Sequence, residues 1–275
     1  MNLSVSCRIA EGFLSKEEAI MTLEELADLA VSAGFQSLCM RASQIGVQSS
    51  AEEVERAREI LDSRQLGVSM ISGDFDIVYN NEKGPDCLRK ITPYLDLAER
   101  LGSSLIRVCL KEQDDIAPAR SAADEARERG IQLAHQCHIG SIFETVDQII
   151  ESLDAIDRPN FGLIYEAANL EQCQQDYGPD TIRRLAPWIR NVYLQNQRLD
   201  AEGAVTLETR CAGPVSFDII EIPEAGGIDF ASVFDGLKQV GYEGPITVHQ
   251  SAPEDGATSP LESAVKTADF LRRFG

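Results

Sequence analysis

The sequence predicts an α/β fold: a single (β/α)8 barrel domain over residues 1–275, with eight parallel strands inside a ring of helices. Two observations support it. Short β-prone segments alternate with amphipathic helical segments from end to end, and no linker or low-complexity tract separates them. The length of 275 residues agrees with one domain, because barrels of this kind run to roughly 250 residues.

Eight short apolar runs are expected to form the strands, since each is bounded by turn or helix signals. They are Leu3–Arg8, Gln36–Arg41, Gly67–Ile71, Ser104–Cys109, Ile131–Gln136, Phe161–Tyr165, Asn191–Gln195 and Pro245–His249.

Amphipathic segments between these runs are expected to form the helices, among them residues 22–35, 49–65, 84–102, 114–130, 141–156 and 229–241. The seventh unit carries an insertion at residues 199–227 before its helix. Long insertions of this kind are usually functional, so we expect it to lie over the active-site face.

Composition narrows the function. The net charge of −20 argues against a nucleic-acid partner, because nucleic-acid binding relies on a basic surface. The apolar runs are too short to span a membrane, and the N-terminus does not read as a signal peptide. The seven cysteines lack zinc-like pairing and are expected to be reduced core residues. These features together predict a cytoplasmic protein.

Strand alternation indicates which side chains face the barrel interior. The three histidines, which are the only ones in the chain, all lie where an apolar run ends. His249 and His138 share the inward phase, and His135 faces the helices, where a structural role is expected. In the other strands, Glu166, Tyr193, Gln136 and Gln195 stand at the same end, with Asn169 just beyond.

Arginines occupy inward positions in the first half of the chain. Arg8, Arg41 and Arg107 are all expected at the barrel mouth. A buried guanidinium needs an anionic partner. Glu166 is one candidate partner, acidic loop residues are another, and a ligand carboxylate or phosphate is a third. We therefore take Arg41, Arg107 and also Arg198 as candidate substrate contacts.

Four segments resemble the xylose-isomerase-like TIM barrels, the sugar phosphate isomerase/epimerase superfamily. They are IQLAHQCHIG, FGLIYEAANL, IRNVYLQNQR and GGIDFASVFDGLKQVGYEGPITVH. The resemblance implies a divalent metal held at the ends of the last four strands, at the positions of Gln136, Glu166, Tyr193 and His249. In the family these are Glu, Asp, His and Glu, so all four are changed here.

The changes weaken the implied metal chemistry. Mg²⁺ relies on carboxylate oxygens, whereas Glu166, His249 and Gln136 could hold Mn, Zn or Co, or leave the site without metal. Glutamine cannot act as a base, so the resemblance implies a proton transfer that depends on His249 and Glu166, with Tyr193 or His138 as the opposing acid.

The resulting expectation is a sugar isomerase or epimerase acting on a small polyhydroxylated, anionic substrate such as a sugar phosphate or sugar acid. Gln136, His138, Asn169 and Gln195 would contact its hydroxyl groups. Two alternatives stay open: a lyase or dehydratase of the same superfamily, and a non-catalytic barrel that binds a sugar-like ligand. The family also leaves room for a homo-oligomer.

Overall fold

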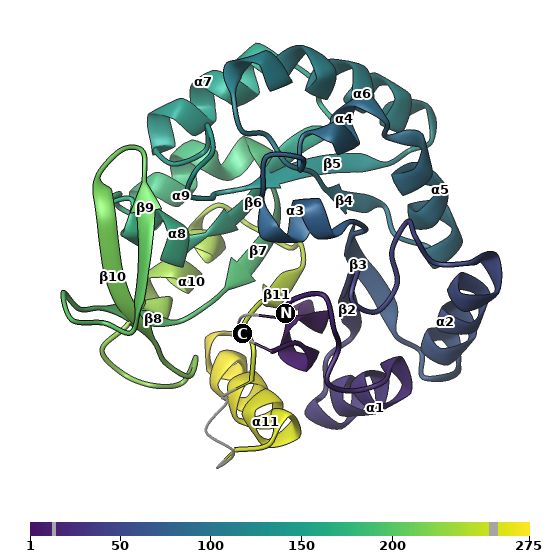
Figure 1. Ribbon diagram of the computed structural model, residues 1–275. Helices are drawn as coiled ribbons and strands as arrows, with labels where there is room; N and C mark the ends of the chain where they lie inside the picture. The colour runs from purple at the N-terminus through teal and green to yellow at the C-terminus, as the bar shows by residue number, and fades with distance from the viewer. Residues whose placement is uncertain (13–14, 253–257) are drawn as a thin grey trace.

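A computed structural model describes residues 1–12, 15–252 and 258–275. Its centre is a closed, all-parallel barrel with strand order β1-β11-β7-β6-β5-β4-β3-β2, which confirms the predicted fold class (Figure 1). The barrel strands are β1 (Leu3–Ser6), β2 (Ser37–Arg41), β3 (Gly67–Ser72), β4 (Leu105–Arg107), β5 (Gln132–Gln136), β6 (Phe161–Glu166), β7 (Ile189–Leu194) and β11 (Ile246–Val248).

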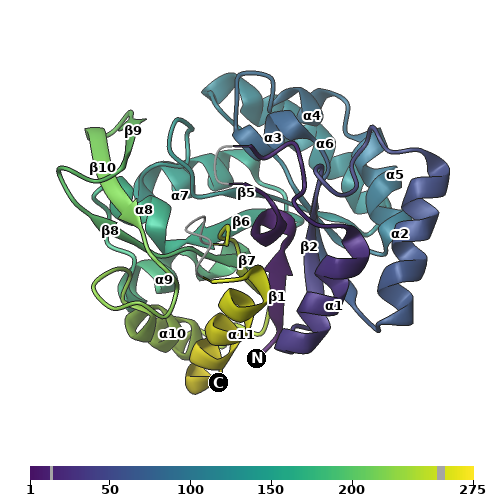
Figure 2. The ribbon, with the colours of Figure 1, turned by 60° about the horizontal axis from the view of Figure 1, so that its bottom comes forward.

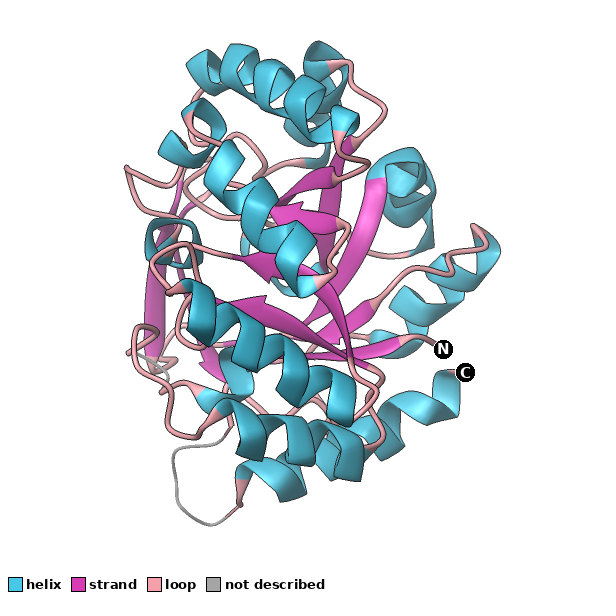
Figure 3. Cartoon of the chain, turned by 90° about the vertical axis from the view of Figure 1, so that its right-hand side faces the viewer, coloured by secondary structure: helices cyan, strands magenta, loops and turns pink. Residues whose placement is uncertain are grey.

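Helices surround the strands on the outside (Figure 3). The longer ones are α1 (Leu23–Ala33), α2 (Ala51–Ser63), α5 (Thr92–Leu101), α6 (Ile116–Glu128), α7 (Val146–Ile156), α9 (Pro179–Leu185), α10 (Phe230–Gln239) and α11 (Pro260–Leu271). Shorter turns are η1 (Cys7–Ala10), α3 (Phe75–Tyr79), α4 (Asp86–Arg89), η2 (Gln113–Asp115), α8 (Ala167–Gln172), η3 (Ala186–Trp188) and η4 (Arg272–Phe274). None of the described helices is both long and apolar enough to cross a membrane.

Local sequence signals explain where the helices begin and end. Thr22 caps α1 and Ser50 caps α2, each with a glutamate three residues later that completes a capping box. Gly34 and Gly102 end α1 and α5 in the left-handed conformation, with φ of 79° and 68°.

The predicted helix over residues 84–102 is wrong as a single element, because the chain forms α4 and then α5. Pro93 stands in the first turn of α5. Proline is tolerated there but lacks the N–H that a continuous helix would need.

The insertion folds into its own three-stranded antiparallel sheet, made of β8 (Gln197–Leu199), β9 (Val205–Thr209) and β10 (Gly213–Ile219). We call this sheet the cap. It stands at one edge of the barrel beside α8 and α9 (Figures 1 and 2).

The main core lies between the barrel and its helices, and a second, small cluster fills the barrel interior. That inner cluster consists of Cys39, Met70, Leu105, Ala134, Ile164 and Tyr193. Filling the barrel with layers of side chains is usual for this architecture. This cluster fills the barrel interior below the carboxyl ends of the strands.

Gly162 in β6 marks a close approach between backbone segments. A methyl group there would overlap the carbonyl oxygen of Trp188 and the side chain of Arg190. We expect Gly162→Ala to lower the free energy of unfolding by about 1–3 kcal/mol, measured by urea denaturation. Gly67→Ala is the control, since a methyl group there makes ordinary contacts. Equal stability of the two variants would contradict the expectation.

Candidate functional site

A cavity of about 710 Å³ lies at the carboxyl ends of the barrel strands, between the barrel and the cap. Its barrel wall includes Gln136, Asn169, Gln195 and His249, and the cap contributes residues 204–208 with Phe217 and Ile219. The carboxyl end of the strands is where barrel enzymes carry their active sites. The cavity is therefore the candidate site.

The polar wall follows directly from strand alternation. Each residue of the inner apolar cluster is followed, two positions along its strand, by a residue of the next layer. The pairs are Cys39 and Arg41, Met70 and Ser72, Leu105 and Arg107, Ala134 and Gln136, Ile164 and Glu166, and Tyr193 and Gln195. The apolar layer fills the barrel, and the next layer forms the floor of the site.

The charge of the cavity is opposite to that of the protein. The lining residues carry five cationic side chains and a single acidic one, Glu208, in a chain with a net charge of −20. The cationic residues are Arg8, Lys16, Arg41, Arg107 and Lys111. Such a cavity favours an anionic ligand or a reaction that develops negative charge.

Glu166 ends β6 and is completely buried behind two amides. Its Oε2 accepts hydrogen bonds from Gln136 Nε2 and, at 2.6 Å, from Asn169 Nδ2, whereas Oε1 has no hydrogen-bond partner among the described residues. Burial raises its pKa to about 7, against the effects of the two amides and the charge of Arg107. A carboxyl group with that pKa can take up and release a proton near neutral pH.

His249 follows β11 and lines the cavity. Its Nδ1 lies 3.0 Å from Ser6 Oγ, and its ring stacks on Tyr193 with centroids 3.8 Å apart. Burial, followed by the charges of Arg41 and Arg107, holds its pKa well below the usual value. The imidazole is therefore neutral at physiological pH and suited to hydrogen bonding more than to strong base catalysis.

Tyr193 belongs to the inner apolar layer. It is 1% exposed, its Oη lies 3.3 Å from Cys39 Sγ, and it is absent from the cavity lining. Burial raises its pKa well above the usual value, so the phenol stays protonated. The structure places Tyr193 as a support beneath His249, whereas the sequence predicts a catalytic acid there.

The other two histidines take different positions. His138 lines the cavity, and its Nδ1 lies 2.7 Å from the carbonyl oxygen of Ile139. The amide nitrogen Nδ2 of Asn80 lies 3.0 Å from the same Nδ1, so this ring nitrogen stands between a carbonyl acceptor and an amide donor. His135 faces the helices as the sequence predicts: its Nδ1 contacts Val108 O at 3.1 Å, and burial lowers its pKa to about 3.

The arginines do not share one partner. Arg41 Nε donates to Glu11 Oε1 at 2.8 Å, and both side chains are buried. Arg8 Nη1 lies 3.6 Å from Glu11 Oε2. Of the candidate partners, an acidic residue outside the barrel strands is the one found for Arg41, and Glu166 is not its partner. The sequence analysis did not single out Glu11. The signal was present, since Glu11 follows Arg8 by three positions just after β1.

Arg107 differs from the other two arginines. It is 1% exposed, and its Nε and Nη1 have no hydrogen-bond partner among the described residues. It lines the cavity together with His249, and its charge lowers the pKa of both Glu166 and His249. A buried guanidinium with free donors is costly unless a ligand satisfies it.

Two lysines line the cavity and were missed from the sequence. Burial, with the charges of nearby arginines, lowers the pKa of Lys16 to about 8, and Lys111 Nζ donates to Asn80 O at 2.9 Å. Both lie in loops outside the strand pattern, so alternation cannot find them. Arg198, by contrast, was predicted from the sequence as a substrate contact, but it pairs with Glu224 at 2.9 Å and is not among the cavity-lining residues.

Glu144 fastens the cap to the barrel. Its carboxylate accepts hydrogen bonds from the backbone N–H groups of Gly140, Arg210 and Cys211. The last two residues form the turn between β9 and β10.

We expect Glu144→Ala to speed hydrogen exchange at the Arg210 and Cys211 amides by about tenfold or more, because hydrogen bonds to charged groups are worth roughly 1.5–3 kcal/mol. Mass spectrometry measures the exchange. Glu112→Ala is the control, since it removes only an exposed ion pair with Arg210. Unchanged protection in the Glu144 variant would show that other contacts hold the cap.

A divalent metal at the strand ends fits these residues poorly. Of the four positions, only Glu166 is a carboxylate, and its Oε2 is occupied by amide donors. Tyr193 is a protonated phenol turned to the inner layer. The surrounding lining is cationic, which opposes a second positive charge. The predicted set of Glu166, His249 and Gln136 is therefore a weak site even for Mn, Zn or Co.

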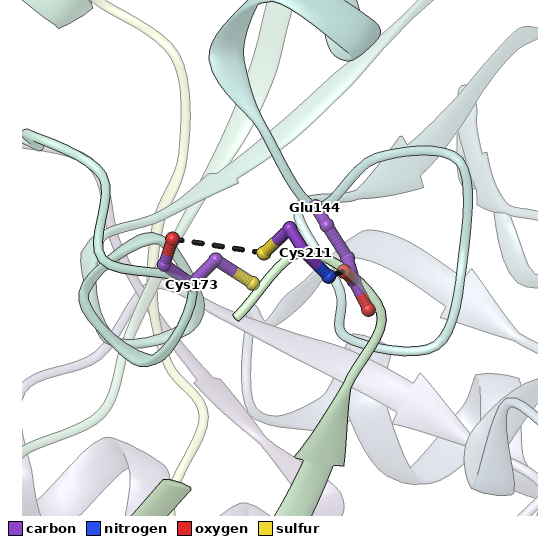
Figure 4. Close-up of side chains that lie close together, drawn as sticks. All are labelled: Glu144, Cys173 and Cys211. Carbon is purple, nitrogen blue, oxygen red and sulfur yellow. Dashed lines mark hydrogen bonds between the residues drawn. The ribbon is translucent and has the colours of Figure 1, made fainter. Parts of the chain in front are cut away.

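A different trio of side chains brings metal-ligating atoms together. Among the described residues, one group of three His, Cys, Asp or Glu side chains brings its ligand atoms within 4.8 Å of one another: Glu144, Cys173 and Cys211 (Figure 4). Glu144 already accepts three backbone hydrogen bonds there. These bonds attach the cap to the barrel, and the attachment explains why the three side chains lie close together.

Comparison with known proteins shows related sequences among dehydratases. Inosose dehydratase from Geobacillus thermodenitrificans is 26% identical over 150 residues, which is 54% of this chain and 50% of that protein. The chain thus spans about half the length of the curated relatives it matches.

Solved structures share the fold over the whole chain. The probable 3-DHS dehydratase AsbF from Bacillus anthracis has a TM-score of 0.74 at 15% identity and covers 99% of both chains. D-allulose 3-epimerase from Methylomonas sp., solved with D-allulose, has a TM-score of 0.69 at 18% identity, with coverage of 100% of this chain and 97% of that one. The family model described as "Xylose isomerase-like TIM barrel" matches residues 27–274. The chain belongs to the xylose isomerase-like TIM barrel family.

Proposed function

We propose that the protein is a lyase that removes water from a small polyhydroxylated ketone. One observation carries the proposal: Glu166 lies directly behind two cavity-lining amides, Gln136 and Asn169, with a pKa of about 7, while His249 in the lining is a neutral imidazole. Epimerisation by two opposed carboxylates is not open to this pair. Elimination needs only one group that accepts a proton and returns it. The sequence similarity to an inosose dehydratase supports the same class.

In the proposed reaction Glu166 takes the proton from the carbon next to the carbonyl group. The electron pair of the broken C–H bond moves toward the carbonyl oxygen and then forms a C=C bond as the neighbouring C–O bond breaks. The departing hydroxyl takes the proton back from Glu166 and leaves as water. One carboxyl group with a pKa of about 7 suffices for both transfers.

The remaining polar lining residues orient the substrate in this proposal. Gln136, Asn169, Gln195 and His138 face the cavity and offer amide and imidazole groups to hydroxyls. His249 binds a hydroxyl or the carbonyl oxygen, and Tyr193 acts as a positioning residue by stacking on it. Arg41 and Arg107 attract negative charge on the substrate. Arg198 has no part, because its side chain is exposed and pairs with Glu224.

The test is a panel assay with purified protein in D₂O. The substrates are inosose, 3-DHS and D-allulose, followed by ultraviolet absorbance and proton NMR. We expect loss of water and a new conjugated C=C–C=O absorbance with at least one of the first two. Solvent deuterium at the carbon beside the carbonyl, with an epimer and no loss of water, would establish an epimerase instead. Tight binding with no chemistry on any compound would establish a binding protein.

A further inference from the structure

Arg107 is the least satisfied charged group in the barrel. Its side chain is buried, and both Nε and Nη1 lack a partner among the described residues. Nε and Nη1 belong to different edges of the guanidinium, each completed by Nη2, and a guanidinium edge binds an oxyanion in a fixed fork geometry. Arg107 also lines the cavity, so it offers the cavity a cationic donor group for an oxyanion.

The surroundings of Arg107 concentrate positive charge at the same place. Lys16, Arg41 and Lys111 line the cavity with it. Arg41 Nη2 also lacks a partner, although Arg41 Nε is bound to Glu11. Arg107 follows Leu105 on one face of β4, and its register partner in β5 is Ala134, two residues before Gln136. Gln136 and Glu166 are two of the positions at which the family resemblance implies a divalent ion.

We infer that Arg107, supported by Lys16, supplies the positive charge that metal-dependent barrels take from a divalent ion, so that the reaction proceeds without metal. The inference rests on the proposed dehydration. When Glu166 removes the proton, the electron pair reaches the carbonyl oxygen, and the free N–H groups of Arg107 hydrogen-bond the oxygen anion. The charge then returns to form the C=C bond as water leaves. Preorganised donors of this kind stabilise developing charge strongly in a buried site.

A simpler role for Arg107 is to hold a carboxylate of the substrate. The two roles differ in kinetics. Holding a distant carboxylate is the same in ground state and transition state, so its loss raises KM, whereas stabilising the developing oxyanion lowers kcat. Arg107→Lys keeps the positive charge and nearly the same side-chain volume but loses the planar guanidinium donors. It should therefore lower kcat if Arg107 stabilises the oxyanion, and raise KM if Arg107 holds a carboxylate.

The first experiment requires no turnover. Protein treated with EDTA is titrated with oxalate, a planar dianion that resembles an enolate, by calorimetry in the continued presence of EDTA. We expect binding by the wild type and affinity at least about tenfold weaker in Arg107→Met, because a charge-assisted hydrogen bond contributes a factor of that size. Arg56→Met is the matched control, since Arg56 is an exposed residue with 73% side-chain exposure that pairs with Glu24. Circular dichroism confirms folding of each variant, and Lys16→Met gives a second test at a less buried position.

The second experiment uses the substrate found by the panel. We expect EDTA to change the rate by less than twofold, added Mn²⁺ to give no stimulation, and Arg107→Lys to lower kcat more than it raises KM. Turnover that is lost with EDTA and restored by Mn²⁺ would overturn the inference and leave the dehydration intact. Oxalate binding through Arg107 with no turnover of any panel compound would instead refute the dehydration and keep the oxyanion site. Oxalate binding that appears only with Mn²⁺, or equal binding by Arg107→Met, would overturn the inference directly.

Discussion

Replacing Glu166 with glutamine is expected to lower kcat for water elimination by about 10²–10⁴-fold, the usual contribution of a general acid–base group. Glutamine keeps the size of the side chain and its hydrogen bonding but cannot carry the proton. Steady-state kinetics on the panel substrate measure the effect. Glu202→Gln is the control, because Glu202 is exposed in the turn between β8 and β9. A Glu166→Gln enzyme with near-normal kcat would remove Glu166 from the mechanism.

The pH dependence of activity in the wild type and in Glu166→Gln gives an independent test of the role of Glu166. Burial raises the pKa of Glu166 to about 7, and Glu166 must be ionised to accept the proton. Activity of the wild type should therefore rise with pH through about 7, and the residual activity of Glu166→Gln should not.

Stability follows with the opposite sign. The unfolded chain ionises this carboxyl at a lower pH than the folded chain does. The free energy of unfolding of the wild type therefore falls as the pH is raised from the ordinary glutamate pKa of 4.5 to about 7. Compared with the wild type, Glu166→Gln should be relatively more stable at pH 8 than at pH 4. Urea denaturation at both pH values measures this difference, and a difference that does not change with pH would contradict the raised pKa.

Glu11→Ala should give the largest loss of stability, about 3–5 kcal/mol in the free energy of unfolding. Glu11 and Arg41 form an ion pair at 2.8 Å with side-chain exposures of 0% and 1%. Removing the carboxylate leaves the Arg41 charge buried beside the other cations of the cavity. Chemical denaturation monitored by circular dichroism measures the loss.

Two further variants test the cause of that loss. Glu24→Ala removes an exposed ion pair with Arg56 and should cost less than about 1 kcal/mol. The double variant Glu11→Ala/Arg41→Met removes the uncompensated charge and should recover part of the lost stability. If Glu11→Ala is no more costly than Glu24→Ala, the buried pair contributes little.

The fold could be predicted from the sequence because it depends on repeated local signals. Strand alternation also placed Arg41, Arg107 and Gln136 on the inward face, and all three line the cavity. The inward phase recurs every second residue along a strand, so these positions can be predicted without knowledge of distant contacts.

Other features depend on the height of a side chain in the barrel or on contacts between distant segments. Tyr193 has the correct inward phase but lies one layer too low, and alternation alone does not give the layer. Glu11 meets Arg41 across 30 positions of sequence, and Lys16 reaches the cavity from a loop. The cap was expected only as an insertion, because its pairing is set by contacts that sequence periodicity does not record.

The contrast between an acidic protein and a cationic cavity also affects how fast ligands arrive. An anionic substrate approaches a molecule with a net charge of −20 and is repelled until it reaches the cavity. Salt at physiological strength screens charges beyond roughly 8 Å, so it weakens the outer repulsion more than the attraction inside. The association rate constant for an anionic substrate should then rise as salt is added, the reverse of ordinary electrostatic steering. The negative exterior would act as a kinetic filter that admits anions more readily as the ionic strength rises.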